Sequence, residues 1–162
     1  MEYHPVVNKI LDLLKKNDYW YETFEHESVR TSEEAAKVRT GYSLDQGAKA
    51  MIVRIKKSES DKKFVMLVVP GNLRFDERKV KDLYGAKDIR FASEEEVDRL
   101  TGGVLPGGVP PFGNLFNLET VVDPKLLLNE KVIFNAGDKR FSIALKSKDY
   151  LEAVKPQIVP IT

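Results

Sequence analysis

The chain has 162 residues, no cysteine, two histidines and a formal net charge of +1. This length is typical of one domain, so we expect residues 1–162 to form a single unit. Without cysteine there can be no disulfide, thiol nucleophile or thiolate metal site, and two histidines do not favour a histidine-built site either, so we expect no metal and no cofactor. The near-neutral charge provides no global field for nucleic acid. No apolar run is long enough to span a bilayer and the first residues lack a signal-peptide layout, so we expect a cytoplasmic protein without a membrane partner.

Hydrophobic periodicity predicts the elements of the first half of the chain. Helical spacing predicts a helix over 5–16, and alternating aromatic residues predict a strand over 19–26. Thr31, with a glutamate three positions later, is expected to cap a short helix that ends at Val38. Two apolar segments, 48–55 and 64–70, are expected to pair as a hairpin, with the second strand buried on both faces.

The second half continues with short elements. Helical spacing that ends at Gly85 predicts a helix over 76–84, and a capping box at Ser93 with Gly102 as its stop predicts a helix over 93–100. Further segments predict strands over 89–92, 118–123, 131–135 and 141–145 and a last helix over 147–154, after which Pro156 and Pro160 should stop regular structure.

Three hairpin-like pairs with short helices between them indicate the fold class. We expect an α+β domain with a mixed, mainly antiparallel, barrel-like β-sheet surrounded by short helices.

The segment Gly102–Gly113 is the most unusual part of the sequence. It holds five of the ten glycines and three of the eight prolines, a density that neither a helix interior nor a central strand tolerates. Prolines stiffen such a loop, and glycines allow a ligand to approach its backbone closely. A surface crossover is the plainer alternative; a binding loop is the interpretation we develop.

Lys49 is the strongest candidate for a chemically active side chain. It stands near the start of a predicted strand between Gly47, Ala48 and Ala50, which leave space beside it. A cation held against a sheet can bind a phosphate or carboxylate oxygen, although a lysine that simply projects into water is the more common case.

Other polar candidates each have a structural alternative. His26 can be an exposed or satisfied histidine, Asp123 can form an Asx turn before a proline, and Asn135 and Gly137 can belong to a hairpin. The glycine loop lacks the lysine and hydroxyl residue of a P-loop, and no serine lies in a nucleophile-elbow context. What remains is a set of backbone amides and one cation, which suits the orientation of an ester carbonyl and a water molecule.

Six short segments, in this order and at these spacings, closely resemble the YbaK / prolyl-tRNA synthetase-associated editing domain family. They cover roughly residues 20–152 and are His26 with Thr31 and 33–36, then 47–50, Val69-Pro70, 100–102 running into 107–113, Val122-Asp123 and 135–137. The chain contains no synthetase core, so the resemblance is to a free-standing member.

The resemblance implies a deacylase that acts in trans on mischarged tRNA of the Cys-tRNA(Pro) or Ala-tRNA(Pro) type, with the ribose hydroxyl of the substrate assisting water. It implies that Lys49 is the key lysine, that the aminoacyl pocket is lined by backbone amides of the glycine loop, and that several further positions lie near it. These loop and neighbouring positions are Gly107, Gly108, Val109, Pro110, His26, Thr31, Asp123, Asn135 and Gly137. Some relatives have a histidine in the last hairpin and this chain has none, which argues against a histidine-dependent mechanism.

A second hypothesis is a non-catalytic module that binds a nucleotide, an aminoacyl group or tRNA beside a synthetase. The low net charge motivates it, because unaided tRNA binding normally uses many basic contacts. Prolyl-tRNA synthetase or an elongation factor would then be the partner that delivers tRNA. Local basic clusters that could contact RNA are 56–57, 62–63, 78–79 and 139–140.

Overall fold

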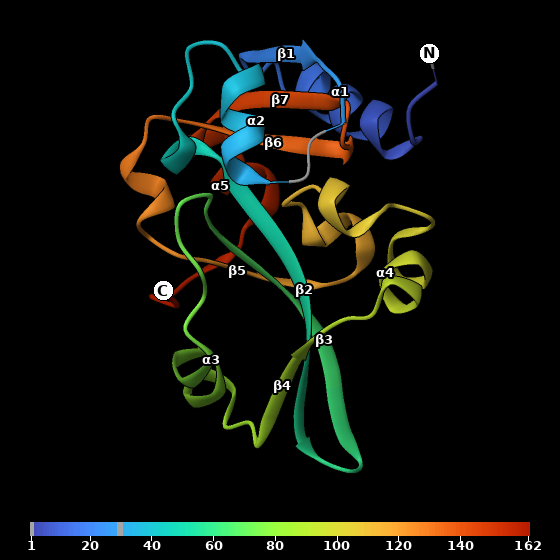
Figure 1. Ribbon diagram of the computed structural model, residues 1–162, viewed down its shortest axis with the longest axis vertical. Coiled ribbons are helices and arrows are strands. Elements are labelled where there is room, and N and C mark those ends of the chain that lie inside the picture. The colour runs from blue at the N-terminus through green and yellow to red at the C-terminus, as the bar shows by residue number, and fades with distance from the viewer. Residues whose placement is uncertain (1, 29–30) are drawn as a thin grey trace.

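The computed structural model describes residues 2–28 and 31–162, and within them the strands form two sheets. Figure 1 shows the three-stranded sheet at the upper end of the molecule and the tip of a long hairpin at the lower end. The helices are α1 (Val6–Lys16), α2 (Ser32–Val38), α3 (Glu77–Tyr84), α4 (Glu94–Thr101) and α5 (Ser147–Val154). The strands are β1 (Tyr21–Glu25), β2 (Ala48–Ser58), β3 (Asp61–Pro70), β4 (Asp88–Phe91), β5 (Glu119–Val122), β6 (Lys131–Asp138), β7 (Phe141–Lys146) and β8 (Gln157–Ile158).

Local capping explains the helix boundaries. The Asp76 carboxylate accepts hydrogen bonds from two backbone amides at the start of α3, and Ser93 forms the expected capping box at the start of α4. Gly85 and Gly102 end these helices in the left-handed conformation, with φ of 61° and 72°. The Thr31 hydroxyl accepts from the Glu34 amide at 3.1 Å, which confirms Thr31 as the cap of α2.

The expected β2–β3 hairpin is confirmed, but the expected barrel is not found. The sheets have the strand orders β1-β7-β6 and β4-β2-β3-β5-β8, so both are open with free edges. The Gly47–Ile133 bridge links them. Most pairs are antiparallel, whereas β3–β5 and β5–β8 are parallel. Parallel neighbours cannot be joined by a tight turn, which is why hairpin reasoning from the sequence did not find them.

Two details of the strand prediction are wrong. Consecutive strands form hairpins at β2–β3 and β6–β7 in the described residues, and not at a third place, because β1 pairs with β7 more than a hundred residues later. The short strand β8 lies between Pro156 and Pro160 and pairs with β5. The prolines flank β8 without occupying it, so they do not remove its backbone donors.

The buried core fixes the position of the glycine loop. Strand β3 is buried on both faces, as expected, and Val65 through Val69 are 0% exposed. Phe112, at the end of the loop, packs edge-to-face against Phe134 of β6 and Tyr150 of α5. The Tyr150 hydroxyl donates to the Pro111 carbonyl at 2.6 Å, so this end of the loop is anchored in the core.

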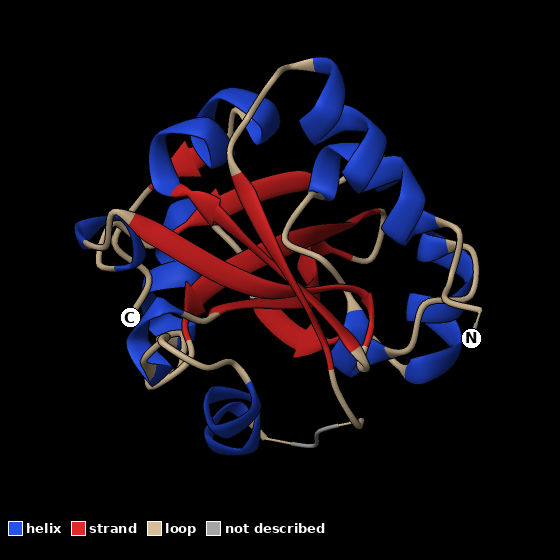
Figure 2. Cartoon of the chain, turned by 90° about the horizontal axis from the view of Figure 1, so that it is seen from above, coloured by secondary structure: helices blue, strands red, loops and turns tan. Residues whose placement is uncertain are grey.

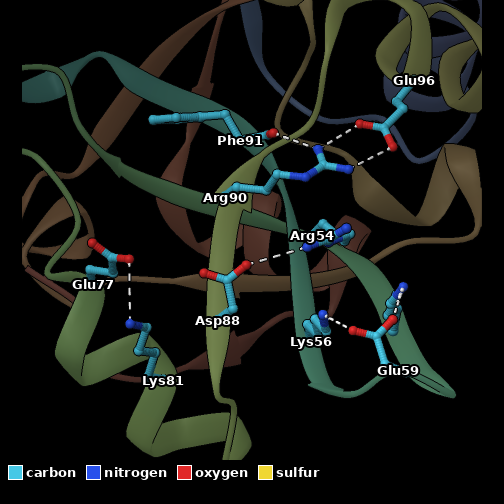
Figure 3. A network of polar contacts seen from close by, with 10 residues as sticks. Arg54, Lys56, Glu59, Glu77, Lys81, Asp88, Arg90, Phe91 and Glu96 are labelled. Atoms are coloured by element: carbon cyan, nitrogen blue, oxygen red, sulfur yellow. Dashed lines mark hydrogen bonds and ion pairs between the residues drawn. The ribbon is translucent and has the colours of Figure 1, made fainter.

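Helices surround the strands when the molecule is viewed from above (Figure 2). The far part of the β2–β3 hairpin, together with β4, carries a set of ion pairs (Figure 3). They join Arg54 to Asp88, Glu59 to Lys56 and Lys62, and Arg90 to Glu96. None of the helices that the structure describes combines the length and apolar character needed to cross a bilayer.

Candidate active site

A cavity of about 160 Å³ lies where α2, the start of β2, the glycine loop and β6 meet. Five of the side chains or backbone positions predicted from the sequence line it: Thr31, Lys49, Gly107, Val109 and Asn135. Thr31 and Asn135 are more than a hundred positions apart in the sequence, so the fold itself assembles the site. The expected convergence of the glycine loop and the strand-borne lysine is therefore present in the structure.

Lys49 is half-buried and already has one backbone partner. Its Nζ donates to the Leu73 carbonyl oxygen at 2.7 Å. Burial lowers the pKa of this ammonium, nearby Arg74 lowers it further, and Glu33 partly offsets both effects. An ammonium has three donors, so Lys49 retains donors for an anionic or carbonyl oxygen of a ligand in the cavity.

The glycine loop is held by its own hydrogen bonds and by β6. The Gly108 amide donates to the Leu105 carbonyl at 2.8 Å, and the Val109 amide donates to the Pro106 carbonyl at 3.5 Å. Of the Gly107 and Gly108 amides that we expected to face a ligand, the Gly108 amide is thus used within the loop. The Asn135 side chain donates to the Gly107 carbonyl at 2.8 Å, which fixes Gly107 at the cavity wall.

Gly108 and Pro110 are buried behind this wall and do not line the cavity. A Cβ at Gly108 would lie 3.4 Å from the backbone nitrogens of Asp138 and Lys139. Gly108 therefore supports the cavity wall by packing on the β6–β7 hairpin.

Sequence reasoning missed Arg39, which also lines the cavity. Its side chain donates from Nε to the Ser142 hydroxyl and from Nη2 to the side-chain amide oxygen Oδ1 of Asn135, both at 3.0 Å. Arg39 is 6% exposed, and burial lowers its pKa to about 10, so the guanidinium remains charged at neutral pH. In the sequence Arg39 is only the residue that follows a short helix. Its burial depends on Ser142, which lies 103 positions later.

His26 lies beside this network and outside the cavity lining. Its Nε2 is 2.8 Å from the Ser142 hydroxyl, and its Nδ1 is 2.8 Å from the Glu27 carbonyl. Ser142 thus connects His26 to Arg39. In this position His26 can orient the network from behind without reaching a ligand.

The structure places Asp123 away from the cavity. One carboxylate oxygen accepts from the Ile161 amide at 2.8 Å and from the amide and hydroxyl of Thr162 at 2.9 and 3.0 Å; the other accepts from the Lys125 amide at 2.8 Å. Burial opposes ionisation of Asp123, but these hydrogen bonds outweigh it and lower its pKa. Asp123 therefore holds the last described residues of the chain against β5.

Gly137 also lies outside the cavity and has a packing role. Its φ is +110°, and a Cβ at this position would lie 1.9 Å from Cγ1 of Val6. Only glycine allows α1 to approach the β6–β7 hairpin this closely.

Among the described residues, no group of three or more metal-ligating side chains is brought together, at this site or elsewhere.

Comparison with known proteins agrees with this arrangement. The family model of the aminoacyl-tRNA editing domain matches residues 26–153. A multifunctional Ser/Thr-tRNA deacylase ProXp-y from Escherichia coli K12 is 32% identical over 152 residues, 93% of this chain and 89% of that protein. A proline–tRNA ligase from Bacillus licheniformis is 33% identical over 124 residues, which are 75% of this chain and 20% of the ligase.

A solved structure of a putative trans-editing enzyme for prolyl tRNA synthetase superposes with a TM-score of 0.81 at 26% identity, over 99% of both chains. The fold and the cavity thus define an editing domain of the α+β type. The chain belongs to the aminoacyl-tRNA editing domain family. It is an enzyme of the aminoacyl-tRNA deacylase class, as the sequence motifs implied.

Proposed function

We propose that this protein removes small, wrongly attached amino acids from tRNA in trans, by hydrolysis of the aminoacyl ester in the cavity between α2, β2 and the glycine loop. The observation that carries the proposal is that Lys49 and Gly107 line the same cavity. Editing in a second site is needed because a methylene-scale difference gives a synthetase only ~10- to 200-fold discrimination.

The cavity favours a small acyl group. Much of its wall consists of alanine and glycine, including Ala36, Gly47, Ala50 and Gly71, and its volume is about 160 Å³. Alanyl, cysteinyl, seryl and threonyl esters are the candidates of suitable size. They include the Cys-tRNA(Pro) and Ala-tRNA(Pro) substrates expected from the sequence and the Ser/Thr class that the name of the E. coli relative gives for that protein.

The chemistry requires little from the protein, because an aminoacyl ester is already activated. Lys49 binds an oxygen of the terminal adenosine's phosphate or of the ester, and the Gly107 wall holds the acyl group. Water attacks the ester carbon, with the neighbouring ribose hydroxyl assisting the proton transfer. The bond to the ribose oxygen then breaks, and this oxygen takes a proton, giving free amino acid and uncharged tRNA.

Binding of the tRNA body is expected to be weak and sensitive to salt. Of the basic clusters, Lys56 and Lys62 are both paired with Glu59 (Figure 3). Lys139 lies beside Gly107 of the cavity wall, where a Cβ on Gly107 would lie 3.2 Å from its Nζ. A surface with so much of its charge neutralised favours delivery of the substrate by prolyl-tRNA synthetase or an elongation factor.

The test is a deacylation assay with purified protein on alanyl, cysteinyl, seryl and threonyl esters of tRNA(Pro) and of one other tRNA. We expect release of amino acid above the uncatalysed rate for at least one ester, and loss of most of this release in Lys49→Ala. No release from any ester would refute the proposal. Salt-dependent retention of the same tRNAs on filters, without turnover, would then support the binding-module hypothesis.

A further inference from the structure

A buried cation with an unused donor faces the cavity. Within residues 2–28 and 31–162, the hydrogen bonds of Arg39 use Nε and Nη2, and none uses Nη1. Nη1 lies at the cavity wall, because a Cβ built on Gly47, which lines the cavity, would be 3.6 Å from it. The guanidinium therefore presents N–H donors to the space where a ligand would lie.

Among the described residues, no acidic group compensates this charge. In the described part of the chain, no carboxylate forms an ion pair with Arg39, and burial is the cause that lowers its pKa. A buried charge without a counter-ion is costly unless its donors find acceptors. Asn135 and Ser142 satisfy two of its nitrogens. The third requires an oxygen atom from water or from the ligand.

Three of the other polar side chains that line the cavity already have a partner among the described residues. The Thr31 hydroxyl accepts from the Glu34 amide, Ser43 is bonded to Asp45 and Gln46, and Lys49 donates to the Leu73 carbonyl. Arg39 differs from these three in that it is a buried cation whose Nη1 has no partner at all among the described residues. An oxygen-bearing acyl group would satisfy it, and a purely apolar acyl group would leave it unpaired.

Building on the proposed deacylase function, we infer that Arg39 determines the acyl specificity, by donating a hydrogen bond from Nη1 to the side-chain hydroxyl of a seryl or threonyl ester. Alanine has no acceptor there, and a thiol is a weak one. A site built to hydrogen-bond a substrate hydroxyl discriminates strongly against the analogue that lacks it. The cation also repels the substrate's α-ammonium, which directs the amino group toward the cavity mouth and the side chain toward Arg39.

The test compares kcat/KM for seryl and alanyl esters of the same tRNA. In the wild-type protein we expect the seryl ester to be preferred by about tenfold to a hundredfold, the range of one hydrogen bond to a charged group. Arg39→Met keeps an unbranched apolar stem and removes the donors, so this ratio should fall toward one. Because it is a ratio, a general loss of folded protein does not change it.

Arg54→Met is the matched control. Arg54 is also a largely buried arginine, but it lies on β2, outside the cavity, and is paired with Asp88. Its replacement should therefore leave the ratio of seryl to alanyl kcat/KM unchanged. If Arg39→Met does not fold, the wild-type ratio still decides, since equal rates for the two esters would overturn the inference. If Arg39→Met lowered kcat/KM equally for the seryl and alanyl esters, the inference would also be overturned. Arg39 would then contact the ester group that both substrates share. Absence of hydrolysis for every ester would instead refute the deacylase proposal itself.

Discussion

Replacing Asn135 with alanine should loosen the cavity wall and slow deacylation. The side chain donates to the Gly107 carbonyl at 2.8 Å and accepts from Arg39 Nη2 at 3.0 Å. A neutral hydrogen bond contributes about 1 kcal/mol and one to a charged group about 1.5 to 3 kcal/mol. Because Asn135 is only half-buried, we expect the free energy of unfolding to fall by about 2 kcal/mol. In a chain of this size this corresponds to a melting temperature lower by about 4 to 8 °C.

Thermal unfolding, monitored by circular dichroism, measures the loss of stability. The value of kcat/KM on the preferred ester measures the loss of activity. We expect kcat/KM to fall about tenfold or more, since displacement of a positioning group by an ångström can cost that much. Asn114→Ala is the control, because Asn114 donates a similar hydrogen bond to the Ala153 carbonyl on the surface, outside the cavity. Wild-type stability together with a wild-type rate in Asn135→Ala would refute the idea that this amide holds the loop.

Two further predictions concern charged groups. Asp123→Asn should destabilise the protein by about 2 to 3 kcal/mol and leave kcat/KM of the folded protein unchanged, since the carboxylate accepts several hydrogen bonds outside the cavity. The pKa of Asp123 is lower in the folded state, so the carboxylate's contribution to stability is present above the unfolded pKa of about 3.9 and is lost as pH falls through the folded pKa. Urea titrations at pH 3 and pH 7 should therefore show a smaller difference in the free energy of unfolding for the variant than for the wild type. An equal difference in the two proteins would contradict this assignment. Because burial lowers the pKa of Lys49, and we propose that it acts as a cation, kcat/KM corrected for uncatalysed hydrolysis should decline on the alkaline side below the ordinary lysine range. Lys49→Arg should move that decline to higher pH, and an unmoved profile would mean that another group titrates.

The sequence predicted the parts of this fold that depend on neighbouring residues. The cap at Ser93 and the left-handed stops at Gly85 and Gly102 involve contacts within one or two turns, so they could be recognised directly. The parallel pairing of β3 with β5 and the two open sheets depend on contacts between distant segments. Periodicity contains no information on such pairings, and the expected barrel was wrong for that reason.

The same distinction applies to the site. Lys49 and the glycine loop could be found because small neighbours and an unusual composition mark them in the sequence. Arg39 carries no local mark, since its burial is created by Asn135 and Ser142 on the β6–β7 hairpin. Asp123 carries a motif but is committed to the Ile161 and Thr162 amides, a contact that only the folded chain shows.

The most direct test of the account is to fill the cavity and measure deacylation. Ala36 lines the cavity from α2, and Ala36→Phe would place a ring in a space of about 160 Å³ while leaving Lys49 and Arg39 intact. Lys37→Phe, at an exposed position of the same helix, is the control for adding a ring to α2. We predict that Ala36→Phe loses at least about a hundredfold in kcat/KM, the scale of a misplaced reacting group, while the control retains its rate. Wild-type kcat/KM in a folded Ala36→Phe protein would contradict the claim that the ester is hydrolysed in this cavity.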